Sequence, residues 1–538
     1  MTAALGNSER QLGGIGHFIS RAAEIHPVRI AIDDLLNTRR LSYRELDERI
    51  NRLGRALRSL GIGKGDMVAV MMWNGHPLVE TIFACARIGA IVAPLNVRLI
   101  GDEVAAYVNE HGCRAIVAGA DFVDRFSGAD AGLRLVSGGA APDAWRDYEG
   151  MLAAQEGGAL PVATALDDPY RLVMTGGTTG RSKGVLHSQG GTIITVLADI
   201  AEYGIGRGWQ TLSILPGYHV AGMEWGMFTI FARAGTVVFP ADTSFNAARY
   251  IAEIRARGIE YLPLVPAIVP ALADAWDGVP LTAPRTVVTT AAPTPEPLRR
   301  TLAAMFPQAG IVAAAGLSES LNMATQAPGE FLDRPLGIGE PHVDTRLVIL
   351  DDDDRPVPPG TPGHIALRNF NTALGYHLNE EAAAVTWRPR RHDAEGLFWC
   401  FTGDIGVMDA DGHLTLVDRS KDIILTGGES VPSIEVETVF AAHPALRDCA
   451  AVGIDDDRWG EAILLVAVRA DTTRAAAIDD AALAAELFVW GRGQMSGFKM
   501  PKKIAFLDSL PRSHFGKVLK RDLRERTFER LYTASRAR

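Results

Sequence analysis

The densest group of residues capable of chemistry is a glycine-rich loop at residues 175–184, with the sequence TGGTTGRSKG. Its glycines let the backbone bend so that several N–H groups can converge on one anion. Three threonine hydroxyls, beginning with Thr175, add donors, and Lys183 adds a compact positive charge. The residue order matches neither GxxxxGK[ST] nor GxGxxG. The loop therefore predicts a polyphosphate site of another kind.

This loop resembles the phosphate-binding motif of the adenylate-forming superfamily, which includes acyl-CoA synthetases, aryl-CoA ligases, firefly luciferase and the adenylation domains of peptide synthetases. Ser182 stands where the superfamily usually has proline. Further landmarks follow in order, and the likeness runs from about Phe18 to Leu523. The resemblance implies an enzyme that uses ATP and Mg²⁺ to convert a carboxylic acid into an acyl adenylate and pyrophosphate. It also implies transfer of the acyl group to a thiol, usually that of coenzyme A.

The resemblance also assigns the residues around the phosphates. The segment AAAGLSE at 313–319 matches a motif usually written Tyr-Gly-x-Thr-Glu. Glu319 is expected to hold Mg²⁺ and to act in catalysis with Thr175, and Ser318 to contact the α-phosphate; oxygen ligands of this kind suit a hard cation. Ala315 stands where the superfamily commonly has an aromatic ring that stacks on adenine. The expected nucleotide-binding residues in these two segments are Thr175, Gly176, Gly177, Thr178, Thr179, Gly180, Lys183, Ala315, Gly316 and Ser318.

The rest of the nucleotide site is expected from three later segments. TAAP at 290–293 resembles a Gly-Ala-Pro segment, so Ala291 and Ala292 are expected to line the nucleotide. FTGD at 401–404 matches a Thr-Gly-Asp motif, in which the carboxylate, here Asp404, accepts both ribose hydroxyls. Arg419 matches an arginine that also contacts the ribose, and Lys421 occupies the position of the superfamily's interdomain hinge.

The C-terminal part carries two more motifs. LTGGESVPSIE at 425–435 resembles the loop that forms one wall of the tunnel for the pantetheine arm of coenzyme A. Gly427 and Gly428 suit a wall without side chains, although Ser430 stands where asparagine is usual. LPRSHFGK at 510–517 closely resembles the motif whose lysine, here Lys517, reaches the carboxylate and α-phosphate during adenylation. Its charge would offset the repulsion between two anions.

The segment LPGYHVAG at 215–222 resembles the superfamily's Pro-x-x-His segment, which forms one wall of the acyl pocket. Relatives that activate amino acids place an aspartate in this region, and none lies between Leu215 and Phe228, so an amino-acid substrate is disfavoured. A medium-sized apolar cavity of the benzoate-ligase kind is expected, open to aryl, alicyclic or medium-chain acids. Its expected lining is His219, Val220, Ala221, Trp225, Ala291, Gly316, Leu317 and Asn322.

Three functions stay open on these residues. The leading one is an AMP-forming acyl- or aryl-CoA synthetase. The second is an acyl-AMP ligase that loads the thiol of an acyl-carrier protein and shares every adenylation residue. The third is a catalytically inactive nucleotide-binding regulatory protein, suggested by Ala315, Ser430 and Ser182, and disfavoured by Glu319, Asp404 and Lys517 together.

Strand and helix patterns must position these residues. Apolar spacing over Leu41–Gly63 predicts a helix with a capping box at Ser42 and Glu45. MVAVMMW at 67–73 and AIVAPLN at 90–96 read as buried parallel strands. Further strands are expected at 171–174, 236–239, 286–289 and 346–350, and helices at 245–257 and 296–305.

These patterns predict an α/β fold: a large N-terminal domain of βαβ-rich sheets packed with a smaller β-barrel-like part, and a small mobile α+β C-terminal domain. We expect an adenylation domain at residues 1–419, with the acid and nucleotide site. The lid domain is expected at 420–538, with the catalytic lysine and the tunnel wall.

Composition sets the outer limits. The 538 residues carry a formal charge of −10, which disfavours nucleic acid or an anionic membrane as the main partner. The four cysteines lack disulfide or zinc spacing and are expected to be buried, reduced thiols. The sequence shows no leader pattern and no apolar run long enough to span a bilayer, so we expect a cytoplasmic protein. We expect it to be a monomer or a homodimer.

Overall fold

The computed structural model describes residues 13–161, 164–175, 183–292, 294–335, 337–391, 396–427, 429–470, 478–512 and 518–533. The chain divides into two compact units. The first unit comprises Met1–Leu347, Leu367–Arg390 and Glu395–Cys400, and the second comprises Val348–Ala366, Arg391–Ala394 and Phe401–Arg538. The domain boundary expected at 419/420 stays a prediction.

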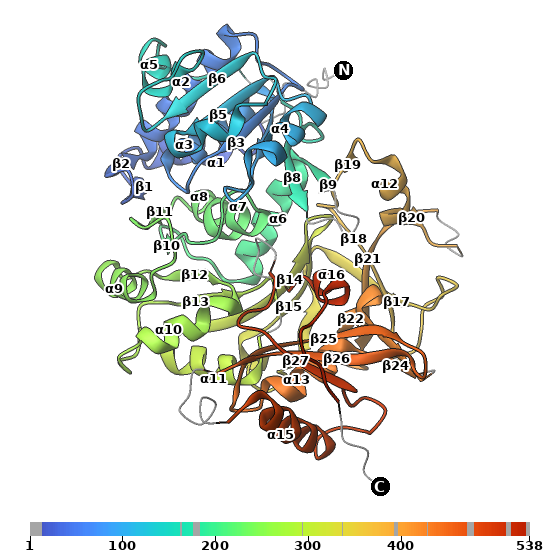
Figure 1. The fold of residues 1–538 in the computed structure, drawn as a ribbon. Coiled ribbons are helices and arrows are strands. Elements are labelled where there is room, and N and C mark those ends of the chain that lie inside the picture. The colour runs from blue at the N-terminus through green and yellow to red at the C-terminus, as the bar shows by residue number, and fades with distance from the viewer. Residues whose placement is uncertain are drawn as a thin grey trace. The chain divides into compact units, whose positions relative to one another are not determined.

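One sheet of the first unit carries the flanks of the glycine-rich loop (Figure 1). Its central strands are parallel and fully buried, as their continuous apolar runs predicted. At one edge, β9 runs antiparallel to β8, and β19 runs antiparallel to β9. The strand order is β19 (Gly375–His377), β9 (Lys183–Ser188), β8 (Pro169–Thr175), β4 (Ile91–Pro94), β3 (Met67–Met71), β5 (Ala115–Gly119), β6 (Leu133–Ser137), β7 (Arg146–Asp147).

A second sheet of the first unit carries the segments that match the nucleotide motifs. Strands β1 and β10–β14 are parallel, and the sheet then turns antiparallel at β15 and β16. The order is β2 (Arg39–Ser42), β1 (Ile30–Asp34), β11 (Thr236–Phe239), β10 (Gln210–Leu212), β12 (Tyr261–Leu264), β13 (Thr286–Thr289), β14 (Gly310–Leu317), β15 (Leu321–Gln326), β16 (Gly337–Pro341).

The helices of the first unit begin and end where local chemistry predicts. At the start of α2, Ser42 accepts from the Glu45 N–H while the Glu45 carboxylate accepts from the Ser42 N–H, so the expected capping box is confirmed. The two helices expected at 245–257 and 296–305 form as α9 and α11. The main helices are α1 (His17–Ile25), α2 (Tyr43–Ser59), α3 (His76–Ile88), α4 (Gly101–Glu110), α5 (Tyr148–Ala153), α6 (Gln189–Glu202), α7 (Val220–Met223), α8 (Thr229–Ala232), α9 (Ala247–Arg257), α10 (Val269–Ala275), α11 (Glu296–Met305) and α12 (Glu380–Thr386).

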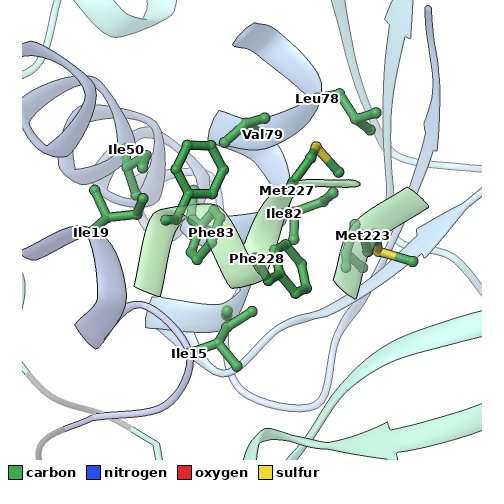
Figure 2. Close-up of a cluster of buried hydrophobic side chains, with 14 of the residues drawn as sticks. Ile15, Ile19, Ile50, Leu78, Val79, Ile82, Phe83, Met223, Met227 and Phe228 are labelled. Atoms are coloured by element: carbon green, nitrogen blue, oxygen red, sulfur yellow. The ribbon is translucent and has the colours of Figure 1, made fainter. Parts of the chain in front are cut away.

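A hydrophobic core anchors the segment expected to form the acid pocket (Figure 2). Met223, Met227 and Phe228 lie on α7 and the following π-helix η3 (Glu224–Phe228), and Phe228 packs edge-on against Phe83 of α3. Ile19 of α1 and Ile50 of α2 belong to the same core. This burial fixes one face of the segment, so the other face can be presented precisely.

The second unit combines part of a sheet with an α+β module. Strands β17 (Thr345–Leu350), β18 (Gly363–Asn369), β21 (Phe398–Met408) and β22 (Leu414–Arg419) lie in that order. In the described residues all sheets run as open paths, so the expected β-barrel-like part is not a closed barrel. The module contains β23 (Ile424–Thr426), β24 (Glu429–Val431), β25 (Leu446–Asp456), β26 (Gly460–Arg469), β27 (Lys503–Phe506), β28 (Tyr532–Thr533), α13 (Ser433–Ala441), α15 (Asp480–Arg492) and α16 (Lys520–Glu525).

Two further expectations concern the chain as a whole. All four cysteines are buried and free, as expected, and burial raises the pKa of Cys85 and of Cys113 to about 12. Among the described helices, none combines the length and apolar character needed to cross a bilayer.

Candidate active site

The glycine-rich loop joins β8 to β9. Thr175 and Lys183 are cross-strand partners at its two ends, and the Thr175 hydroxyl donates to the Lys183 carbonyl over 3.4 Å. The hairpin therefore brings both ends of the loop together. The residues between them that were predicted to bind nucleotide, Gly176, Gly177, Thr178, Thr179 and Gly180, lie outside the described residues.

Tyr376 connects Lys183 to the predicted metal ligand, and the sequence motifs had not singled it out. Its hydroxyl donates to Glu319 Oε1 over 2.7 Å, and Lys183 Nζ lies 4.7 Å from the centre of its ring. Burial, together with the charge of Glu319, raises the pKa of Tyr376. Tyr376 belongs to β19, which pairs with β9, so a strand from residues 375–377 places the ring between the two groups. The phosphate-loop cation and the carboxylate thus share one side-chain contact.

The tight hairpin between β14 and β15 presents Ser318 and Glu319. The register shifts by one residue between Ala315 and Gly316, and a Cβ at Gly316 would lie 1.9 Å from the Leu321 carbonyl oxygen. Leu321 adopts φ = 61°, a region that costs a β-carbon-bearing residue about 1–2 kcal/mol. Strain of this kind is concentrated at functional sites. Ser318 is buried, and Glu319 is half-buried.

A chain of buried polar contacts supports this hairpin from behind. Arg171 of β8 ion-pairs with Glu224 of η3, and its Nε donates to His187 Nδ1 of β9 over 3.2 Å. His187 Nε2 then donates to the Ser318 carbonyl over 2.7 Å. Burial and the Arg171 charge lower the pKa of His187 well below 6.5, so the ring stays neutral in the one tautomer that satisfies both contacts. This chain of contacts connects the segment predicted to form the acid pocket to the hairpin predicted to bind the nucleotide.

Sequence reasoning missed this chain, although one signal was available. Arg171 interrupts the apolar strand YRLVM and is fully buried. A charge in such a strand requires a buried partner. The partner is Glu224, which lies in the segment where relatives that activate amino acids place an aspartate. Because the Glu224 carboxylate pairs with Arg171, its charge is already neutralised within the protein.

The segment at 219–225 places the predicted pocket residues in two settings. His219 caps α7, and its Nδ1 accepts from the Ala221 N–H over 3.4 Å. Val220 and Ala221 are partly buried and pack against the core, whereas Trp225 is buried. Leu317, the last residue of β14, is half-buried.

Ala291 and Ala292 follow β13. Ala291 adopts φ = 71°, a conformation that glycine takes without strain. The nearby Pro293 of the same motif lies outside the described residues. The strained backbone supports the expectation that this turn approaches a ligand closely.

Asp199 of α6 joins two predicted pocket residues. Its Oδ2 accepts from Trp225 Nε1 over 3.0 Å, and its Oδ1 accepts from Asn322 Nδ2 over 3.0 Å. Behind it, His342 Nε2 lies 3.4 Å from Asp199 Oδ1, and His342 Nδ1 lies 2.9 Å from Asp344 Oδ1. Burial alone would lower the pKa of His342, but hydrogen bonds and charges from both aspartates raise it to about 9. We call Asp199, His342 and Asp344 the buried acid–histidine cluster.

In the second unit, one hairpin brings together the two predicted ribose ligands. Asp404 of β21 and Arg419 of β22 are cross-strand partners, with Asp404 Oδ1 3.2 Å from Arg419 Nε. The neighbouring Asp418 accepts the Ser433 N–H over 2.6 Å, which ties β22 to α13. The pair has the groups needed to contact a cis-diol.

The predicted hinge residue Lys421 follows directly, in the short 3-10 helix Ser420–Asp422. Arg524 of α16 donates to the Lys421 carbonyl over 3.2 Å and to Asp422 Oδ1 over 2.7 Å. Burial lowers the pKa of Lys421, and the charges of Arg419 and Arg524 add to this effect. The backbone at the predicted hinge is therefore held by one half-buried side chain from α16.

Gly427, a predicted tunnel residue, adopts φ = 62°, and a Cβ there would lie 3.0 Å from the Trp459 ring. Trp459 is thus the side chain that makes glycine necessary, and sequence reasoning had not identified it. Gly428 and Lys517, the other predicted residues of this region, lie outside the described residues.

The donors at Glu319 fit the expected Mg²⁺. One carboxylate oxygen accepts from Tyr376, and the other carries no hydrogen bond among the described residues. Mg²⁺ commonly takes one or two protein carboxylates together with waters and substrate phosphates. No group of three or more acidic, histidine or cysteine ligands gathers elsewhere in the described ranges.

Comparison with known proteins defines the class. The family model for AMP-binding enzymes matches residues 19–377, and the model for the C-terminal domain of AMP-binding enzymes matches residues 435–517. A feruloyl-CoA synthase from Amycolatopsis sp is 30% identical over 522 residues, which are 95% of this chain and 99% of the relative. The fatty acid–[acyl-carrier-protein] ligase ScoC from Streptomyces coeruleorubidus is 30% identical over 507 residues, covering 91% of this chain and 92% of the relative.

A solved structure shares the fold. The anthranilate CoA ligase AuaEII in complex with anthranoyl-AMP superposes with a TM-score of 0.84 at 22% identity, covering 97% of this chain and 98% of that one. Fold and site together define a nucleotide-binding α/β enzyme. The chain belongs to the family of AMP-binding enzymes and, within it, to the acyl- and aryl-CoA synthetase type.

Proposed function

We propose that the protein activates an aryl, alicyclic or medium-chain carboxylic acid with ATP and transfers the acyl group from the adenylate to coenzyme A. The products are the acyl-CoA, AMP and pyrophosphate, so the chain is an AMP-forming acid–thiol ligase. The observation that carries the proposal is that Tyr376 contacts both Lys183 and Glu319. A cation suited to bind phosphate and a carboxylate suited to bind a metal ion therefore lie on either side of one ring.

Each half of the nucleotide has candidate partners. Thr175 and Lys183 are proposed to bind the phosphates, and Glu319 would hold Mg²⁺, which when bound neutralises phosphate charge. Asp404 is proposed to accept the ribose hydroxyls, with Arg419 beside it. Ser318, buried and held through its carbonyl by His187, is proposed to offer its hydroxyl to the α-phosphate.

Attack by a carboxylate on the α-phosphate brings two anions together. Lys517 is proposed to offset that repulsion, since a lysine carries a compact charge on a long mobile stem. The Lys517→Ala variant should therefore lose most acid-dependent pyrophosphate release, while it still forms thioester from a supplied acyl adenylate. Equal loss in both half-reactions would show that Lys517 has another role.

The pairing of Glu224 supports a substrate without an α-ammonium group. This carboxylate is the acidic group of the pocket segment, and Arg171 holds it in a buried ion pair. An amino acid would have to displace Arg171 and leave a guanidinium buried without a partner, which is costly. A plain carboxylic acid makes no such demand.

The acceptor thiol is tested separately. The similarity to ScoC favours a second candidate, in which the thiol belongs to an acyl-carrier protein. A panel of carboxylic acids assayed for pyrophosphate release, with and without coenzyme A, separates the functions. Acyl hydroxamate without any CoA thioester would favour a carrier protein, and no release with any acid would favour a regulatory protein.

A further inference from the structure

Trp225 and Asn322 lie far apart in sequence but meet at one buried carboxylate. The indole N–H and the amide N–H₂ donate to opposite oxygens of Asp199, each over 3.0 Å. Both residues are predicted to line the acid pocket. Because they share this carboxylate, their side chains form adjacent parts of a single wall, which we call the Trp225–Asn322 wall.

The hydrogen bonding fixes which way the Asn322 amide faces. An ionised carboxylate only accepts hydrogen bonds, so the nitrogen of the amide must point to Asp199. Asn322 Oδ1 then points away, and it accepts no hydrogen bond from any residue that the structure describes. On β14 the cross-strand partner of Asn322 is Gly316, which places no side chain beside the amide. Asn322 Nδ2 also lies 3.4 Å from His342 Nδ1, so the amide nitrogen faces Asp199 and His342 and the wall offers one neutral acceptor.

The charge behind the wall is negative. The buried acid–histidine cluster contains two carboxylates and one imidazole, so with both aspartates ionised its net charge is negative even when His342 is protonated. Asp344 is held from the other side by Asn371 Nδ2 over 2.7 Å and by the Thr345 hydroxyl over 2.9 Å. Burial raises the pKa of the Glu202 carboxyl in α6, and the charges of Asp199 and Asp344 raise it further. The nearby cation Arg171 is already paired with Glu224.

Building on the proposed function, we propose that the acid substrate carries a neutral hydrogen-bond donor, such as a phenolic hydroxyl, an amine or a ring N–H, that Asn322 Oδ1 accepts. The same wall selects against acids with a second negative charge. A methyl group at that position would leave the Asn322 acceptor without a partner, and a second carboxylate would face like charge. A methoxy group has no hydrogen to donate, so it could not form a hydrogen bond to Asn322 Oδ1.

A matched panel tests the proposal with the full-length protein. It contains benzoate and cinnamate with hydroxy, amino, methyl, methoxy or carboxy groups at the 3- or 4-position, assayed by kcat/KM for pyrophosphate release with ATP and Mg²⁺. For at least one skeleton and position, we expect the hydroxy or amino acid to exceed the methyl and methoxy acids by about tenfold. The dicarboxylic acid should fall about a hundredfold below the best substrate.

The Asn322→Leu variant locates the effect. It should abolish the preference for hydroxy over methyl, so that kcat/KM for the hydroxy acid falls to that for the methyl acid in the same variant. Met323→Leu is the matched control, because Met323 is the adjacent β15 residue and the exchange conserves volume; its preference should equal that of the wild type. The wild-type panel decides the question even where a variant fails to fold.

The outcomes are distinct. Activation of methyl or methoxy acids as well as hydroxy acids, or preferred activation of a dicarboxylic acid, overturns the inference while leaving the proposed function intact. An unchanged preference in Asn322→Leu overturns the role of Asn322. No pyrophosphate release with any acid refutes the proposed function, and the inference falls with it.

Discussion

The region of the first unit that is predicted to bind the acid and the region of the second unit that is predicted to bind the ribose each contain an ion pair, but with opposite burial. In the first unit, the Arg171 side chain is 0% exposed and Glu224 is 3% exposed. In the second, the Arg419 side chain is 47% exposed and Asp404 is 11% exposed. Buried charges hold one geometry because leaving it is costly, whereas exposed charges exchange partners with water at little cost.

This difference suits the roles proposed for the two regions. A pocket that must select one acid gains from side chains locked by buried contacts. The segment around Lys421, proposed as a hinge, gains from contacts that solvent can replace. The difference in burial between the two ion pairs can be tested by substitution, and the largest effect is expected at the buried pair.

Removing one partner of the buried ion pair should have the greatest effect on stability. We expect Arg171→Met to lower the free energy of unfolding by about 3–5 kcal/mol, because Glu224 would be left buried and unpaired. The double variant Arg171→Met/Glu224→Leu should recover most of that loss. Urea denaturation midpoints measure both. If Arg171→Met and the double variant were equally unstable, packing and not charge would explain the effect.

Changing the proposed metal ligand should mainly affect chemistry. Glu319→Gln keeps the shape of the side chain and can still accept from Tyr376, but it loses the charge offered to Mg²⁺. We expect acid-dependent ATP–pyrophosphate exchange to fall about 10²–10³-fold, with a higher Mg²⁺ requirement. The control Tyr376→Phe removes the hydrogen bond to Glu319 and the weaker one that the Tyr376 hydroxyl accepts from Thr386 over 3.4 Å, and it should cost about tenfold. An equal loss in both variants would contradict a metal role for Glu319.

The buried acid–histidine cluster should make stability depend on pH. The folded protein holds the His342 proton with a pKa of about 9 against an ordinary value of 6.5, so its contribution is complete below about pH 6.5. It is lost as the pH rises through about 9. We expect about 2–3 kcal/mol of stability to disappear over that range. Thermal unfolding between pH 6 and 10 measures it, and His342→Gln should flatten the profile.

The exposed ribose pair should give the smallest effect on stability. Arg419→Ala should lower the free energy of unfolding by less than about 1 kcal/mol, because solvent replaces the exposed guanidinium contact. Its main effect should be a higher KM for ATP with little change in the KM for the acid. A destabilisation as large as that of Arg171→Met would remove the contrast between the two regions.

Much of the fold follows from local sequence. The capping box at Ser42 and Glu45, the buried strands β3 and β4, and the bounds of α11 were all predicted from spacing and composition. These features depend on residues three or four apart, or on short runs, so local hydrogen bonding and burial determine them. The loop of β8–β9 and the Asp404–Arg419 hairpin were likewise reached through motifs that lie within short segments.

Only the tertiary structure could decide which side chains meet. Tyr376 contacts Glu319 across 57 residues, Asn322 contacts Asp199 across 123, and His187 contacts the Ser318 carbonyl across 131. No periodicity encodes such pairs, because they arise when sheet order and helix packing bring distant segments together. The sequence alone thus determined the reaction class and the main candidate residues. The tertiary structure decided how those residues are held, since a buried polar group must find its partner wherever the fold places one.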